Sequence, residues 1–86
     1  MNVTLKTLEH LNGYDQDCVQ FYLEINAGGE THTVNVLSVP KSYYRAQIAA
    51  NWTQARESVW PALCWQQKWL RQQGLDHWDV WQAYQD

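Results

Sequence analysis

The sequence predicts an α+β fold: a three-stranded antiparallel β-meander followed by two to three α-helices, in the order β-β-β-α-α-α. Three observations support this prediction. Residues 18–26 alternate between apolar and polar side chains, as a half-buried strand does. Two consecutive glycines come soon after that segment and are typical of a hairpin turn. Beyond Pro40 the apolar spacing changes to every third or fourth residue, which indicates helices.

A chain of 86 residues has room for one hydrophobic core, so we expect a single compact domain over residues 1–86. Residues 1–40 would form the meander and residues 41–86 a tryptophan-rich helical half. A domain this small buries only about 60–65% of the surface that its unfolded chain exposes. Its six tryptophans and five tyrosines compensate, because each buried ring removes roughly 150–250 Å² from water.

The meander can be placed strand by strand. The first strand runs from Val3 to about His10, and Asn12-Gly13 in the segment after it favours a tight turn. The second strand covers 18–26, with four side chains on its apolar face: Val19, Phe21, Leu23 and Ile25. Residues 27–30 close a hairpin. The third strand covers 31–39, is rich in β-branched residues and ends at Pro40.

The first helix is expected from Tyr43 to about Arg56, with Ser42 as its N-cap. Its buried stripe would consist of Tyr44, Ile48, Trp52, Ala55 and Val59. Pro61 lacks the N–H group that a helix interior requires. The sequence therefore predicts a break or kink near 57–60 and a second helix after it.

The second helix, centred on 59–71, is apolar on two faces. Val59 and Leu70 lie within roughly 40° of Leu63 on a helical wheel, which defines a core face. Ala62, Trp65 and Trp69 lie roughly 100–160° away. Two alternatives follow for this second face. Either the chain covers it, or Trp65 and Trp69 stay exposed as anchors for a partner or for a second copy.

The last helix has clear signals at its start. Gly74 is expected to end the preceding helix, and Asp76 to cap the next one. Trp78 lies away from the apolar face of that final helix, which would consist of His77, Val80, Trp81 and Tyr84.

The net charge of −3 is unevenly distributed along the chain. Residues 1–40 carry five acidic side chains and one lysine, whereas residues 41–71 carry five basic side chains and one glutamate. Residues 72–86 add three aspartates and no cation. The whole chain would therefore repel a phosphate backbone, but its middle segment would attract one.

The compartment is expected to be the cytoplasm. The first residues lack the basic and apolar regions of a signal peptide, and no apolar run approaches the ~20 residues of a membrane helix. Cys18 and Cys64 are too few for a disulfide framework. We therefore expect no association with membranes.

Signatures of catalysis and of metal or cofactor binding are missing from the sequence. The four glycines form no phosphate-binding loop. The histidines and cysteines show no metal-ligand spacing. Asp76, His77 and Asp79 are adjacent, but helix capping explains both aspartates. We expect no enzymatic activity, no metal and no cofactor.

A nucleic-acid-binding protein is one alternative, because the helices in 41–71 combine tyrosines with cations. The cations are Lys41, Arg45, Arg56, Lys68 and Arg71. Only five cations spread over this segment, and the acidic flanks compete with phosphate. Direct binding of nucleic acid is therefore less favoured than binding of protein.

The remaining function is that of a small acidic protein-binding module. We expect an inhibitor or antagonist that occludes a protein or nucleoprotein partner, as many small anti-defence proteins of phages and mobile elements do, anti-CRISPR proteins among them. Acidic residues near the chain ends and exposed tryptophans would form its contact surface. These residues are Asp15, Asp17, Trp65, Trp69, Trp78, Asp79 and Asp86. A homo-oligomerising assembly subunit is a further alternative.

Overall fold

The computed structural model describes residues 1–11 and 17–85. Strands β1 (Asn2–Leu11), β2 (Asp17–Ala27) and β3 (Glu30–Pro40) form an antiparallel sheet in the order β1-β2-β3. The helices of this described part are α1 (Lys41–Ala46), α2 (Ile48–Trp65), α3 (Gln67–Gln72) and α4 (His77–Gln85). The predicted α+β meander followed by helices is confirmed. The predicted turn at Asn12-Gly13 lies outside the described residues.

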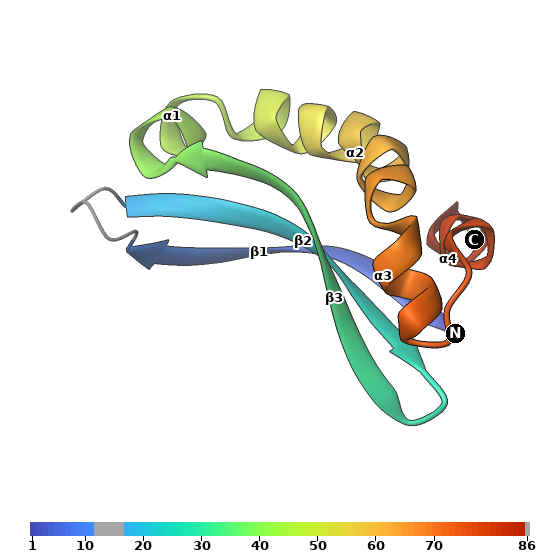
Figure 1. Cartoon of the computed structure of the whole chain (residues 1–86). Helices are drawn as coiled ribbons and strands as arrows, with labels where there is room; N and C mark the ends of the chain where they lie inside the picture. The colour runs from blue at the N-terminus through green and yellow to red at the C-terminus, as the bar shows by residue number, and fades with distance from the viewer. Residues whose placement is uncertain (12–16, 86) are drawn as a thin grey trace.

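The helices run along the length of a curved sheet (Figure 1). Helix α1 lies at the end where β3 finishes, α2 and α3 follow over the sheet, and α4 lies at the other end beside the N-terminus (Figure 1). α2 packs against β3, and α4 packs against β1. The helices therefore cover one face, whereas Leu8 on the opposite face is 58% exposed.

The alternation in β2 positions the core as predicted. Val19, Phe21, Leu23 and Ile25 are all at most 1% exposed. Gly28 and Gly29 adopt φ angles of 61° and 80°, the left-handed values that a two-residue hairpin turn of type I′ needs. The hairpin between β2 and β3 is confirmed.

A β-bulge in β3 was not expected. Tyr22 pairs with Asn35, but the preceding Phe21 pairs with Leu37, so Val36 is the extra residue. The bulge shifts the inward-facing positions of β3 from even to odd numbers: both Val34 and Val39 are buried. The apolar residues of the third strand change from even to odd numbers at the same place in the sequence.

Two connected clusters make up the core. The larger cluster joins the sheet to α2, α3 and α4: Leu23, Ile25, Val34, Val59, Leu63, Leu70, Leu75 and Val80. In the smaller cluster, Phe21 meets Trp52 edge-on at 5.0 Å and Tyr44 at 5.8 Å between ring centroids. Trp52 Nε1 also donates a hydrogen bond of 3.1 Å to the Tyr44 hydroxyl. These aromatic contacts fix α1 and the start of α2 against the sheet.

The expected start of the helical half is wrong in two respects. Ser42 is not an N-cap, because α1 already begins at Lys41 and no side chain caps it. The chain also breaks at Gln47, where φ is −138°. The carbonyl of Gln47 accepts both the backbone and the side-chain N–H of Asn51, at 2.9 and 2.7 Å. Tyr44 before the break and Trp52 after it both contact Phe21.

The predicted buried stripe is wrong at Ile48. Ile48 is 50% exposed, although the periodicity places it on the core face. The buried residues of α2 are Asn51, Ala55, Val59 and Leu63, which follow each other at intervals of four. Ile48 shares the side of α2 that holds Ala55 and Val59, but it is the first residue of that helix, and its position on the wheel does not bury it.

The predicted break near Glu57–Trp60 is wrong, because α2 runs through Pro61 to Trp65. The alternative of a kink there stays a prediction. Pro61 and Glu57 are both exposed, so the Glu57 carbonyl that loses its helical donor can bind water instead. Val59 and Leu63, on either side of Pro61, are fully buried. Their burial holds the helix together across the proline.

The second separation lies between α2 and α3, at Gln66. Its side-chain Nε2 donates a hydrogen bond of 2.9 Å to the backbone carbonyl of Asn35, beside the bulge in β3. The single helix expected over 59–71 is therefore two helices. Tertiary contact with the sheet, rather than a helix-breaking residue, marks the junction.

The predicted helix ends around Gly74 are confirmed. Gly74 has a φ of 77°, its N–H bonds the Arg71 carbonyl and the Leu75 N–H bonds the Leu70 carbonyl. This is the Schellman pattern, completed by the burial of Leu70 and Leu75 in one cluster. Asp76 Oδ1 then accepts the N–H groups of Trp78 and Asp79, at 2.8 and 3.4 Å, as an N-cap does.

Candidate functional site

The second apolar face of the tryptophan segment is open to solvent. Trp65 is 88% exposed and Trp69 is 38% exposed, whereas Leu63 and Leu70 are fully buried. Of the two alternatives for this face, coverage by the chain itself is thus excluded for Trp65. An exposed tryptophan is a candidate anchor for a partner, because tryptophan is enriched at interface hot spots.

Trp65 stands beside a groove between α2 and β3, with a volume of about 400 Å³. Its lining carries no charge: Asn35, Val36, Ser58, Pro61, Ala62, Trp65 and Gln66. The hydrogen bond from Gln66 to the Asn35 carbonyl joins its two walls. The sequence analysis missed this groove, although Pro61 and Trp65 are one helical turn apart and share one side of α2.

Helix α3 continues the exposed surface with cations. Relative to the buried Leu70, Lys68 points roughly 160° away, while Trp69 and Arg71 point roughly 100° to either side. Lys68 is also three residues after Trp65, about one turn along. Within residues 1–11 and 17–85, neither Lys68 nor Arg71 forms an ion pair. We call Trp65, Lys68, Trp69 and Arg71 the tryptophan–cation surface.

Trp78 belongs to a different group of aromatic rings. It is 56% exposed, and its ring lies 4.7 Å from that of Trp60. Trp60 also contacts Trp81 at 5.4 Å and His77 at 5.7 Å. Trp60 and Trp65 point roughly 140° apart on α2, so Trp78 lies on another side of the helix from Trp65.

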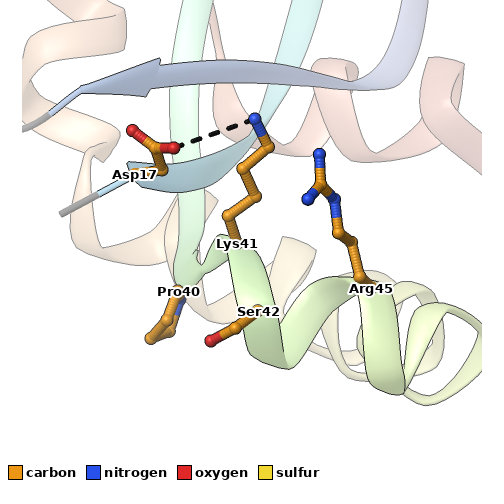
Figure 2. Close-up of a pocket in the computed structure, with 5 residues that line it drawn as sticks. All are labelled: Asp17, Pro40, Lys41, Ser42 and Arg45. Atoms are coloured by element: carbon orange, nitrogen blue, oxygen red, sulfur yellow. Dashed lines mark ion pairs between the residues drawn. The ribbon is translucent and has the colours of Figure 1, made fainter.

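The predicted acidic residues do not meet in one surface. Asp17 begins β2, next to α1, where Lys41 Nζ lies 3.9 Å from its carboxylate and 3.1 Å from that of Glu9 (Figure 2). Asp79 is exposed on α4, at the other end of the sheet (Figure 1). Asp15 and Asp86 lie outside the described residues. The acidic contact surface therefore stays a prediction, and the structure separates Asp17 from Asp79.

A hollow of about 380 Å³ lies beside α1. Its lining combines one carboxylate with two cations: Asp17, Pro40, Lys41, Ser42 and Arg45. In Figure 2 the side chains of Lys41 and Arg45 extend from the same side of α1, but Lys41 turns to Asp17. The ion pairs of Lys41 leave Arg45 as the cation available to an anion here. One arginine makes a weak anion site.

The cations proposed for nucleic-acid binding are spread along the molecule. Lys41 and Arg45 lie on α1, Arg56 lies on α2, and Lys68 and Arg71 lie on α3 (Figure 1). Arg56 is also close enough to Tyr84 to influence its titration. These residues therefore form no single groove of cations that could follow a phosphate backbone.

Two titrating groups lie outside the tryptophan–cation surface. Hydrogen bonds from Lys6 and Asn26 lower the pKa of Glu24 below its ordinary value. Burial raises the pKa of Tyr84, and the charge of Arg56 acts in the opposite direction. The groups that shift these two pKa values are thus Lys6 and Asn26 for Glu24, and Arg56 for Tyr84.

The described residues offer no cluster for metal chemistry: no three His, Cys, Asp or Glu side chains gather among them. Cys18 is buried and Cys64 is half-buried. In the same part of the chain, none of the helices has the length and hydrophobicity to cross a membrane.

Comparison with known proteins gives no relative from which a role could be transferred. No family model, no curated protein and no solved structure matches the chain. A function has to be inferred from the surfaces just described.

Proposed function

We propose that this chain is a non-enzymatic protein-binding module whose anchors are Trp65 and Trp69. The observation that carries the proposal is the 88% exposure of Trp65 at the edge of an uncharged groove. Tryptophan is enriched at interface hot spots, because its burial removes a large apolar area from water at little entropic cost. A partner that covers Trp65 and fills the groove would gain most of its affinity there.

The form of this function that we favour is inhibition by occlusion in the cytoplasm, as in small anti-defence proteins such as the anti-CRISPR class. Trp65 projects from a rigid element, since Leu63 and Leu70 on either side of it are fully buried. A preorganised anchor loses little entropy on binding. Such a module can cover a working surface of a protein or nucleoprotein without any chemistry of its own.

The experiment is affinity capture from cells of the native host, with nuclease treatment, quantified by mass spectrometry. Three baits are compared: the wild-type chain, Trp65→Ala and Tyr43→Ala. Tyr43 is a matched control, because it is an aromatic side chain that is 51% exposed on α1. We expect one partner to be captured by the wild type and Tyr43→Ala and lost with Trp65→Ala.

The size of the loss can be measured on the purified partner. Truncation of a hot-spot tryptophan costs about 2–4 kcal/mol, which weakens affinity by roughly 30- to 1,000-fold. The inhibitor form predicts that the wild-type chain also blocks the activity of that partner. Capture that persists with Trp65→Ala would contradict the proposal. Recovery that depends on nucleic acid would favour the alternative use of the basic residues.

A further inference from the structure

We infer that the tryptophan–cation surface recognises an acidic protein surface: an apolar pocket for Trp65 with carboxylates on its rim. This inference rests on the proposed function and names the chemistry of the partner. It replaces the expectation that this chain supplies the acidic side of the contact. Along α2 and α3, Trp65 and Trp69 are followed by Lys68 and Arg71, and the acidic residue of these two helices, Glu57, lies about two turns before Trp65.

The charges of the surface carry the inference. Lys68 points outward from α3, one turn after Trp65 and next to Trp69, and Arg71 flanks it. Both cations are exposed and without an ion pair within residues 1–11 and 17–85. In contrast, Lys6 and Lys41 are paired with carboxylates at 3.0 and 3.1 Å. The unpaired positive charge of α3 thus lies where the largest exposed ring lies.

The uncharged groove indicates which partner side chains would lie against Trp65. Pro61, Ala62 and Val36 give it apolar walls, and Asn35, Ser58 and Gln66 add neutral polar groups. A charged side chain placed there would lose water without gaining an opposite charge. Apolar side chains of the partner therefore fit the groove, and its carboxylates fit the rim at Lys68 and Arg71.

An acidic protein fits this surface better than a nucleic acid does. Binding to a phosphate backbone relies on several cations that act together. Here Lys68 and Arg71 stand alone, because the other cations lie on β1, α1 and α2. The net charge of −3 would oppose a polyanion at longer range. A protein pocket with a few carboxylates needs fewer cations to balance its charge.

The test uses a phage-displayed library of short random peptides, selected on the immobilised full-length chain. Peptides that also bind the Trp65→Ala/Trp69→Ala variant are removed. We expect the remaining peptides to be rich in Asp and Glu beside aromatic or aliphatic residues. Selection on Lys68→Glu/Arg71→Glu should instead enrich Lys and Arg, because the charge of the rim is reversed.

Affinity measurements on one selected peptide give the magnitude. Lys68→Gln/Arg71→Gln should weaken binding about five- to tenfold at low salt, and the difference should shrink as salt is added. Gln54→Glu serves as a control. It adds one negative charge at an exposed position in the first half of α2, about three turns before Trp65, and we expect less than a twofold change.

Each outcome of these measurements either supports or overturns the inference of an acidic partner. Acidic peptides that depend on both Trp65 and the two cations support the inference. Peptides that depend on Trp65 but show no bias in charge overturn it and leave the proposed function standing. A selection that yields no tryptophan-dependent peptide also overturns it. So does tighter binding of a single-stranded oligonucleotide to this surface, which would reassign the cations to phosphate contacts.

Discussion

At the scale of single residues, His77 is an unusual member of the core. It is only 7% exposed, its ring stacks on Trp60 at 5.7 Å with 29° between the planes, and it opens α4. Among the described residues, none gives its buried Nδ1 a hydrogen bond. A buried polar atom without a partner costs about 1–3 kcal/mol. The stacking contact and the burial of the ring offset this cost.

We predict that His77→Phe raises the free energy of unfolding by about 1 kcal/mol, because the ring contact is kept and the unpartnered nitrogen is removed. His77→Ala should lower it by about 2–3 kcal/mol, because the stack is lost. Urea unfolding followed by tryptophan fluorescence measures both changes. A His77→Phe protein less stable than the wild type would show that Nδ1 has a polar role that this arrangement does not reveal.

The Lys6–Glu24 pair on the open face of the sheet predicts a dependence on pH. Lys6 Nζ lies 3.0 Å from Glu24 Oε2, and this contact, with Asn26, lowers the pKa of Glu24. A carboxyl group with a lowered pKa in the folded state stabilises that state above its unfolded pKa. This stabilisation is lost as the pH falls through the folded pKa.

Lys6→Met should therefore move the pKa of Glu24 back toward its ordinary value. The stability difference between wild type and variant should be present at neutral pH and vanish in acid. Carboxyl chemical shifts followed by NMR give the pKa, and urea unfolding at several pH values gives the stability. Lys41→Met is the control, since Lys41 pairs with Glu9 and Asp17 instead. An unchanged Glu24 pKa in Lys6→Met would refute this account.

At the scale of elements, the proline inside α2 lowers the stability of that helix. Proline inside a helix is about 3 kcal/mol less favourable than alanine, because it removes a hydrogen bond and crowds the preceding turn. Pro61 occupies the exposed side of α2 and lines the groove beside Trp65. A residue that costs stability at the candidate binding surface is consistent with a role in shaping that surface.

Pro61→Ala should increase the free energy of unfolding by about 1–3 kcal/mol, since the Glu57 carbonyl regains its helical donor. Thermal and urea unfolding would measure the gain. Ser58→Ala, one turn earlier, removes only an exposed hydrogen bond of 2.8 Å to the Gln54 carbonyl and should change stability by less than about 0.5 kcal/mol. A loss of stability in Pro61→Ala would mean that the ring makes packing contacts worth more than the helix bond.

At the scale of the whole molecule, the tryptophan–cation surface argues against self-association. A stable interface buries about 800 Å² on each partner, roughly twice the area of two tryptophan rings. In a two-fold symmetric dimer the same patch meets itself. Such a contact would bring Lys68 and Arg71 of one copy near those of the other.

We therefore expect a monomer at micromolar concentrations and physiological salt. Light scattering coupled to size-exclusion chromatography should give the mass of one chain, independent of concentration. High salt screens the repulsion between the cations and should be the condition most favourable to any weak dimer. A dimer at low concentration that dissociates on Trp65→Ser would support the assembly-subunit alternative.

The elements that could be predicted from the sequence are those specified by local chemistry. The alternation around Phe21 specifies β2, Gly28-Gly29 specifies a turn with positive φ, and Gly74 and Asp76 specify a helix end and a helix start. Each of these signals acts within a few residues, so that it is present in the chain before any packing occurs. The α+β class follows from their order.

Contacts between residues that are distant in the sequence determined the other features of the fold. Phe21 contacts Tyr44 and Trp52, which lie on either side of the break at Gln47. The carbonyl of Asn35 holds Gln66, where α2 gives way to α3. Helical periodicity alone left the tryptophan face with two alternatives, because a ring facing away from the core can still be covered by another element. Only the packed structure shows that Trp65 remains in water, and this exposure is what the proposed function depends on.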